Sequence, residues 1–123
     1  MHVIYKDAHV QASSEGMTRK ILAHHGNMML VEVAFHKASD DPGLHSHPHE
    51  QIAYVTKGRF EFLVEGQENV FLGEGDSIYL EPNVVHGGKP LEDNSVLLDI
   101  FTPIREDFLP SATNKQPSHE TGA

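Results

Sequence analysis

The chain reads Gly43-Leu44-His45-Ser46-His47-Pro48-His49-Glu50-Gln51 near its middle, and this stretch holds three of its ten histidines. His45 and His47 are two residues apart, so on a β-strand both imidazoles would leave the same face. Gln51 has the same parity and would add an amide oxygen. Because histidine is the commonest metal ligand in proteins, this spacing predicts several ligands on one strand, aimed at one metal ion.

A third imidazole is expected from a distant part of the chain, and His86 is the candidate. It follows the turn Glu81-Pro82-Asn83, in which Asn83 can take the left-handed backbone conformation that glycine usually supplies. His49 also shares the parity of His45 and His47. Pro48 disturbs the strand between them, so we expect His49 beside the site or at its rim.

Short apolar or alternating runs separated by turn residues make up most of the remaining sequence, which is the pattern of an all-β protein. Strands are predicted over residues 28–35, 51–56, 59–64, 69–72, 77–80, 84–86 and 95–102. On the last of these, Leu97, Asp99 and Phe101 share one face. Gly-rich turns at this spacing predict a β-sandwich or small barrel. One helical turn is expected over residues 105–109.

The composition is that of a soluble domain and excludes several functions. The 123 residues suffice for one domain with its own core. A net charge of -9 argues against nucleic acid or an anionic membrane as a partner. No apolar run approaches the ~18 residues of a membrane span and no signal segment is recognised, so we expect a cytoplasmic protein. Without cysteine, thiol catalysis, disulfides and thiolate metal sites are excluded.

The histidine pattern resembles the cupin superfamily, whose motifs are G-x5-H-x-H-x3,4-E-x6-G and G-x5-P-x-G-x2-H. The residues that match are His45, His47 and Gly58 in the first motif and Gly75 and His86 in the second. The departures are Gln51 at the acidic position, Gly43 only two residues before His45, Glu81 at the usual proline and Asn83 at the usual glycine.

This resemblance covers about residues 16–109 and implies a single-domain cupin fold, the double-stranded β-helix or jelly-roll barrel. We expect the barrel, with an N-terminal strand segment, to occupy residues 1–109. Residues 110–123 are polar without an apolar period and are expected to form a flexible tail.

Gln51 in place of the acidic ligand, together with residues 98–108 (LDIFTPIREDF), is similar to pectin-degradation cupins of the KdgF type. Those enzymes convert 4,5-unsaturated uronates, released by pectate or alginate lyases, to linear 4-deoxy-5-keto uronates. The resemblance implies a homodimer and one divalent transition metal ion (Zn, Ni, Co, Mn or Fe). It assigns the metal to His45, His47, Gln51 and His86, and the catalytic roles to Asp99, Phe101 and Arg105. The stretch 17–22 also resembles such proteins, but no chemistry is assigned to it.

The ligand set itself favours Lewis-acid chemistry on an anionic substrate. Three neutral imidazoles and an amide leave the charge of the ion uncompensated, whereas a carboxylate ligand would favour oxygen activation. Asp99 lies among apolar neighbours, which raises the pKa of a carboxyl group, so it is predicted to be the general base or acid. Arg105 would hold the uronate carboxylate with its bidentate fork, and Phe101 would wall the pocket.

Two other functions stay open at this point. One is another cupin metalloenzyme, such as a dioxygenase or a sugar isomerase, which iron content and oxygen uptake would favour. The other is a non-catalytic cupin that binds a metal or a small acid, which would bind a ligand without turning it over. Asp99 and Arg105 also have a structural interpretation: Asp99 as a satisfied polar group, and Arg105 as its salt-bridge partner or as a surface residue of the helical turn.

Overall fold

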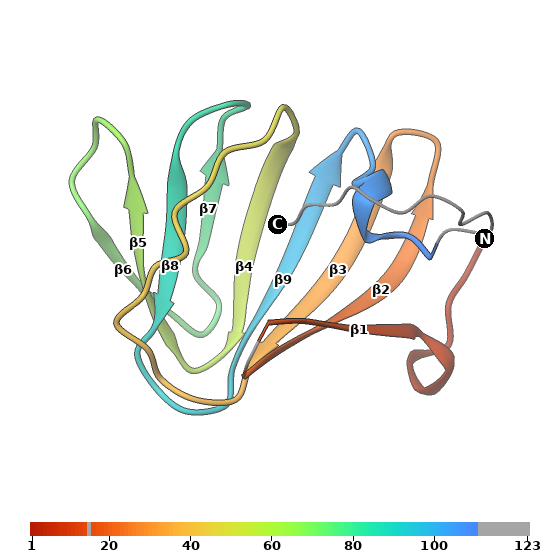
Figure 1. The fold of residues 1–123 in the computed structure, drawn as a ribbon, viewed down its shortest axis with the longest axis horizontal. Coiled ribbons are helices and arrows are strands. Elements are labelled where there is room, and N and C mark those ends of the chain that lie inside the picture. The colour runs from red at the N-terminus through yellow and green to blue at the C-terminus, as the bar shows by residue number, and fades with distance from the viewer. Residues whose placement is uncertain (15, 111–123) are drawn as a thin grey trace.

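The computed structural model describes residues 1–14 and 16–110, which form two facing antiparallel β-sheets (Figure 1). The larger sheet has six strands in the order β1-β2-β3-β9-β4-β7: His9–Ser14, Met17–His25, Met28–Phe35, Ser95–Thr102, Glu50–Lys57 and Ser77–Leu80. The smaller sheet has three strands in the order β6-β5-β8: Val70–Gly73, Arg59–Val64 and His86–Pro90. Two short 3-10 helices lie near the ends, η1 (Tyr5–Asp7) and η2 (Glu106–Phe108).

The predicted all-β fold is confirmed, and four strands have the predicted bounds: β3, β5, β7 and β9. The strand predicted over residues 84–86 is wrong, because β8 begins at His86 and continues through Gly87 and Gly88 to Pro90. A Cβ atom on Gly87 would collide with the carbonyl oxygen of Pro42. The glycine therefore permits close approach of the loop before β4 and does not end the strand.

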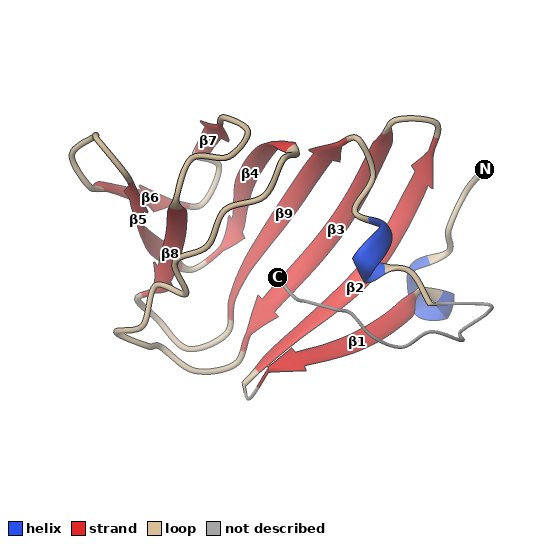
Figure 2. Cartoon of the chain, turned by 45° about the horizontal axis from the view of Figure 1, so that its top comes forward, coloured by secondary structure: helices blue, strands red, loops and turns tan. Residues whose placement is uncertain are grey.

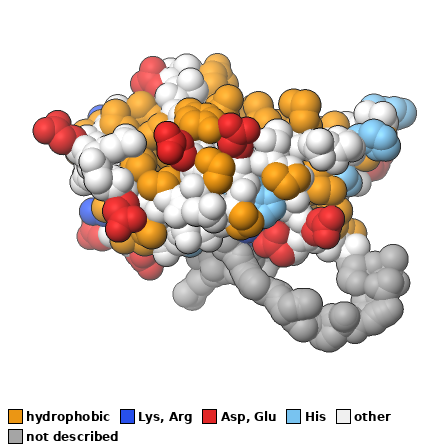
Figure 3. All heavy atoms as spheres, turned by 90° about the horizontal axis from the view of Figure 1, so that it is seen from above, with side chains coloured by type: hydrophobic (Ala, Val, Ile, Leu, Met, Phe, Trp, Pro, Cys, Tyr) orange, Lys and Arg blue, Asp and Glu red, His pale blue; other side chains and the backbone are white. Residues whose placement is uncertain are grey.

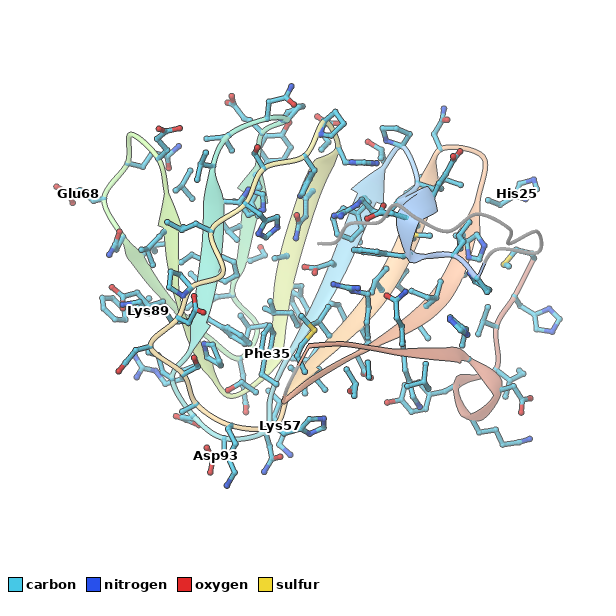
Figure 4. All side chains as sticks on the ribbon, viewed as in Figure 1. His25, Phe35, Lys57, Glu68, Lys89 and Asp93 are labelled. Carbon is cyan, nitrogen blue, oxygen red and sulfur yellow. The ribbon has the colours of Figure 1, made fainter. Side chains whose placement is uncertain are left out.

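The hydrophobic core lies between the two sheets, and alternating residues of each strand supply it. Its buried side chains include Met29, Val31 and Val33 of β3, Ala53 and Val55 of β4, Phe60 and Phe62 of β5, and Leu97 and Phe101 of β9. At one end, the ring centroids of Phe35 and Phe60 are 5.4 Å apart; Phe35 is labelled near the lower end of the view in Figure 4.

Strand register separates this apolar end from the opposite end of the barrel. On β9, Ser95 pairs with Phe35, whereas Phe101 pairs with Met29 on one side and Gln51 on the other. The predicted site residues on β4 and β9 therefore lie toward the end away from Phe35. Figure 2 shows η2 crossing in front of β2 and β3, a part of the larger sheet that the smaller sheet does not cover. Phe108 of η2 is buried in the core there.

Most of the predicted C-terminal tail, residues 111–123, lies outside the described residues, so the domain boundary at residue 109 stays a prediction. The predicted helical turn is present as η2. Among residues 1–14 and 16–110, neither helix has the length or apolar character that crossing a membrane would require.

Candidate metal centre and active site

Three histidines meet inside the barrel. Within the described part of the chain, His45, His47 and His86 are the one group of three or more His, Cys, Asp or Glu side chains whose ligand atoms all lie within 4.8 Å of one another. The prediction that His45 and His47 lie on a strand is wrong, since both belong to the loop before β4. A single bridge fixes this loop: the backbone N–H groups of His45 and His86 each donate to the other's carbonyl at 2.9 Å.

Backbone carbonyls fix the tautomers of two of these rings. Nδ1 of His45 lies 2.6 Å from the carbonyl oxygen of Gly43, and Nδ1 of His86 lies 3.0 Å from that of Val84. A carbonyl only accepts, so both Nδ1 atoms carry the proton and each Nε2 keeps its lone pair. Nε2 of His86 is buried and has no hydrogen-bond partner among the described residues. These rings are oriented as metal ligands are.

Gln51 connects this cluster to Asp99. The Gln51 side chain is buried at the start of β4, with Oε1 3.0 Å from Nε2 of His47. That separation also suits two ligands of one ion, since atoms about 2.1 Å from a metal and at a right angle are about 3.0 Å apart. The Gln51 side chain also lies close enough to Asp99 to help lower the pKa of that carboxyl group. Because the amide oxygen is turned toward His47, the amide nitrogen is left to face the carboxyl group.

Burial keeps the imidazoles neutral and ready to bind a cation. It lowers the pKa of His45 and His86, and it lowers the pKa of His47 to about 4. Neutral nitrogen and amide-oxygen donors suit Zn, Ni, Co, Mn or Fe, so the residues fit a divalent transition metal. Asp99 does not belong to the group of close ligand atoms, and among the described residues no carboxylate joins the three histidines there.

Asp99 is a buried carboxyl group with one free oxygen. It is 6% exposed on the inward face of β9, and Oδ1 has no hydrogen-bond partner among the described residues. Burial raises its pKa to about 6, although Gln51, Arg19 and Arg105 act in the opposite direction. A carboxyl group with this pKa exchanges protons near neutral pH, as a general base or acid must.

Phe101 and Arg105 lie beside this cluster. The Phe101 ring centroid is 5.7 Å from that of His47, and the Arg105 guanidinium is 5.1 Å from the Phe101 ring. Nε and Nη2 of Arg105 donate to the two carboxylate oxygens of Asp107 at 3.1 and 3.0 Å. The alternative in which Arg105 is the salt-bridge partner of Asp99 is therefore wrong, because the bidentate partner is Asp107.

His49 lies next to the cluster, as expected. Its ring centroid is 5.4 Å from that of His47, and it is half-buried. A hollow of about 430 Å³ opens beside it, lined by Gly26, Asn27, His49, Pro103, Ile104, Glu106 and Asp107.

Seen from above, the molecule shows mainly acidic and hydrophobic side chains and few basic ones (Figure 3). The arginines near the site are inside the protein.

Sequence reasoning missed Arg19, a buried arginine on β2 near Arg105 and Asp99. The signal was present: Met17, Arg19 and Ile21 alternate, so an arginine shares the parity of two apolar residues.

Comparison with known proteins shows the family of the chain. Residues 31–101 match the family model described as a cupin domain. The chain is 42% identical to the pectin degradation protein KdgF of Dickeya dadantii (strain 3937) over 96 residues, 77% of this chain and 86% of that protein.

Two solved structures are similar in both fold and sequence. KdgF from Halomonas sp. has a TM-score of 0.81 and 35% identity, over 89% of this chain and 98% of that one. An RmlC-like cupin from Shewanella frigidimarina NCIMB 400 has a TM-score of 0.79 and 30% identity, over 88% of this chain and 95% of that one. The chain is therefore a cupin and belongs to the same family as the pectin degradation protein KdgF.

Proposed function

We propose that this protein is a metal-dependent enzyme that opens the ring of 4,5-unsaturated uronates to linear 4-deoxy-5-keto uronates. The observation that carries the proposal is the arrangement of Asp99: a buried carboxyl group whose Oδ1 has no hydrogen-bond partner among the described residues, beside Gln51, whose amide oxygen contacts His47. The similarity to pectin degradation proteins named KdgF supports the choice of substrate.

The proposed metal ligands are His45, His47, Gln51 and His86. When bound, the ion would act as a Lewis acid that polarises oxygen atoms of the sugar. The donor set is neutral, which supports this role over oxygen activation. Which of Zn, Ni, Co, Mn or Fe is bound is a matter for elemental analysis of the purified protein.

Asp99 is the proposed proton-transfer group. It takes the proton of the anomeric hydroxyl, the C1–O5 bond breaks and C1 becomes an aldehyde. The electron pair of that bond moves to O5, which gives an enolate across C4, C5 and O5. A proton returned to C4, by Asp99 or by water, converts the enolate to the 5-ketone. Atoms and charge balance, because the proton lost from O1 is regained at C4.

Arg105 and Phe101 are proposed to position the sugar. The guanidinium of Arg105 already binds a carboxylate through two hydrogen bonds, which supports its role toward the uronate carboxylate. Phe101 is buried between His47 and Arg105 and would form the wall against which the sugar ring rests.

The test follows the ultraviolet absorbance of the C4–C5 unsaturated galacturonate monomer. It is measured with protein, without protein and with protein treated with a chelator, because this sugar also rearranges slowly by itself. We expect faster loss of absorbance that chelation abolishes and that returning the metal restores. No acceleration with galacturonate or with alginate-derived monomers would reject the proposal. Oxygen uptake by the metal-loaded protein would support a dioxygenase instead.

The homodimer and the cytoplasmic location also stay proposals. Ile52 of β4 pairs with Tyr79 of edge strand β7, and both side chains are exposed on the outer face of the larger sheet, near Tyr54. An apolar cross-strand group on an edge strand supports association with a second copy. Light scattering would measure the oligomeric state, and cell fractionation the location.

A further inference from the structure

Arg19 is a buried cation without a role in the proposed reaction. It is 6% exposed on the inward face of β2. Nη1 donates to Oε1 of Gln11 at 2.6 Å, and the guanidinium carbon lies 3.8 Å from the centre of the Phe108 ring. Neither group is charged. Among the described residues, Nε of Arg19 has no hydrogen-bond partner and the side chain forms no ion pair.

Arg105 shares the same aromatic wall. It is 4% exposed, and its guanidinium carbon lies 4.1 Å from the centre of the Phe108 ring that Arg19 also contacts. Burial, helped by the like charge of Arg105, lowers the pKa of Arg19 to about 10, so Arg19 stays protonated at neutral pH. Two buried cations against one aromatic ring are costly unless an anion lies nearby.

One anion is already present, and it comes from this chain. Asp107 accepts both hydrogen bonds of the Arg105 fork, yet its side chain is 31% exposed and lines the hollow of about 430 Å³. The fork–fork geometry is the one that any carboxylate adopts on arginine. Asp107 therefore marks a carboxylate position that is reachable from solvent, and it leaves Nε of Arg19 without a partner.

We propose that Arg19 and Arg105 form a two-arginine site for the carboxylate of a sugar acid, and that this carboxylate replaces Asp107 on binding. The identity of the sugar rests on the proposed function, but recognition of its carboxylate does not. Arg19 is then a positioning and specificity residue. It distinguishes a uronate from a neutral sugar and leaves the proton transfers to Asp99.

The test measures binding of D-galacturonate to the metal-loaded protein by calorimetry, with D-galactose as the probe that lacks the carboxylate. We expect Arg19→Met to weaken galacturonate binding roughly 10- to 100-fold, the value of a charge-assisted contact, and to leave galactose binding unchanged. Arg19→Lys should restore part of the loss, because it keeps the charge without the fork. Lys20→Met is the matched control: it removes the same charge from the next residue of β2, whose ammonium lies over Tyr5.

Asp107→Asn gives a second and opposite readout. Removing the charge of the internal carboxylate should strengthen galacturonate binding several-fold, because the sugar no longer has to displace a charged competitor. With the unsaturated uronate as substrate, Arg19→Met should raise KM much more than it lowers kcat, since the carboxylate contact is made in both ground and transition states.

The outcomes separate this inference from the proposed function. An Arg19→Met protein that keeps its metal and its melting temperature and binds galacturonate like the wild type overturns the inference, even if uronates are turned over. Equal weakening of galacturonate and galactose overturns it too, because that shows a structural defect. If Arg19→Met does not fold, Asp107→Asn provides the test instead. A galacturonate affinity equal to that of the wild type would then reject the two-arginine site. Arginine-dependent binding without turnover supports the site and rejects the proposed function.

Discussion

Gln51 on β4 lies beside Asp99 on the neighbouring strand β9: it pairs with Phe101, two residues along β9 from Asp99, and its side chain helps lower the pKa of the Asp99 carboxyl group. Because the amide nitrogen faces the carboxylate, the amide oxygen faces Nε2 of His47, at 3.0 Å. A glutamate at this position could not donate to an ionised Asp99 and would place a second negative charge beside it. The glutamine therefore serves both the metal centre and the carboxyl group.

Gln51→Glu tests this double role. We expect the protein to keep its metal, since a carboxylate is also a ligand, but to lose roughly 10-fold or more of its ring-opening activity. The added charge offsets that of the ion and repels the ionised Asp99. Metal content and the rate of absorbance loss are measured together. Glu50→Gln is the control, because the exposed Glu50 carboxylate bonds only to Tyr79 and Thr102 in the described structure. Full activity in Gln51→Glu would contradict the argument.

The histidine cluster predicts how acid affects the metal-free protein. Burial lowers the pKa of His45, His49 and His86, and that of His47 to about 4, whereas an unfolded chain protonates histidine near 6.5. The unfolded state thus binds more protons between about pH 4 and 6.5, so the free energy of unfolding decreases as pH falls through that window.

Urea unfolding of the chelated protein at pH 7 and pH 5 measures this effect. We expect a lower midpoint at pH 5, with His47 alone contributing up to about 2 kcal/mol of the difference. His47→Gln should reduce the pH dependence, and His25→Gln, at an exposed position labelled in Figure 4, is the matched variant. Asp99 acts in the opposite direction, since its raised pKa stabilises the folded state as pH falls, so the same comparison is made in Asp99→Asn. A midpoint that rises toward pH 5 in that variant would show that the histidines are not buried in neutral form.

Local patterns predicted the strands well because period-two alternation and turn residues act within a few positions. Asn83 is one such success: it has the positive φ of 66° that its place in the turn required, and its N–H donates to the carbonyl of His47 at 2.7 Å. The predicted bounds of β8 were wrong because Gly87 is required by close contact with the distant loop at Pro42 and not by a local turn.

The candidate site was less accessible to sequence reasoning, because its members meet through the fold. The spacing of His45 and His47 suggested a shared face, but a loop with one bridge to His86 brings the rings together. Nothing local links Arg19 on β2 to Phe108 on η2, and their contact depends on how η2 covers the sheet. The spacing of residues in the sequence therefore identified which residue types serve as ligands. Contacts between distant segments determine the charges and pKa values around them.

Asp99→Asn should make the metal-free protein more stable and the enzyme inactive. Burial raises the pKa of Asp99 from 3.8 to about 6, so the folded state holds the proton more tightly between those values. Stability conferred by the protonated form is lost as pH rises through that window, and at pH 7 the buried charge costs roughly 1–3 kcal/mol. An asparagine of the same shape removes this cost.

Two measurements on Asp99→Asn check the claim. The urea midpoint of the chelated variant at pH 7 should exceed that of the wild type, and absorbance loss of the unsaturated uronate should fall to the uncatalysed rate with metal content unchanged. Asp93→Asn, which removes an exposed carboxylate paired with Lys37, should move stability by less than about 0.5 kcal/mol. A metal-replete Asp99→Asn protein with normal turnover would exclude Asp99 from proton transfer.

Gly58 is the last residue of the first histidine motif, and its surroundings explain why this position needs a glycine. It has a φ of +80°, and a Cβ atom there would collide with Oγ of Ser95 and lie 2.8 Å from its Cβ and 2.9 Å from its Cα. Ser95 is fully buried and donates to the carbonyl of Glu92 at 2.8 Å, so it has no room to move. Gly58→Ala should cost about 3 kcal/mol or more, from overpacking and backbone strain together.

Gly66→Ala separates these two causes. Gly66 has a similar φ of +84°, but nothing lies within 4 Å of the added Cβ, so only the backbone strain of about 1 kcal/mol applies. Urea unfolding of both variants should therefore show a loss at Gly58 that exceeds the loss at Gly66 by about 2 kcal/mol. In the double variant with Ser95→Gly, the Gly58→Ala cost should shrink but stay above the Gly66 value, because Oγ and Cβ are gone while the Cα of residue 95, 2.9 Å from the added Cβ, remains. Equal losses of unfolding free energy in Gly58→Ala and Gly66→Ala would contradict this. They would mean that contact with Ser95 does not matter and that the left-handed backbone conformation alone explains the glycine at position 58.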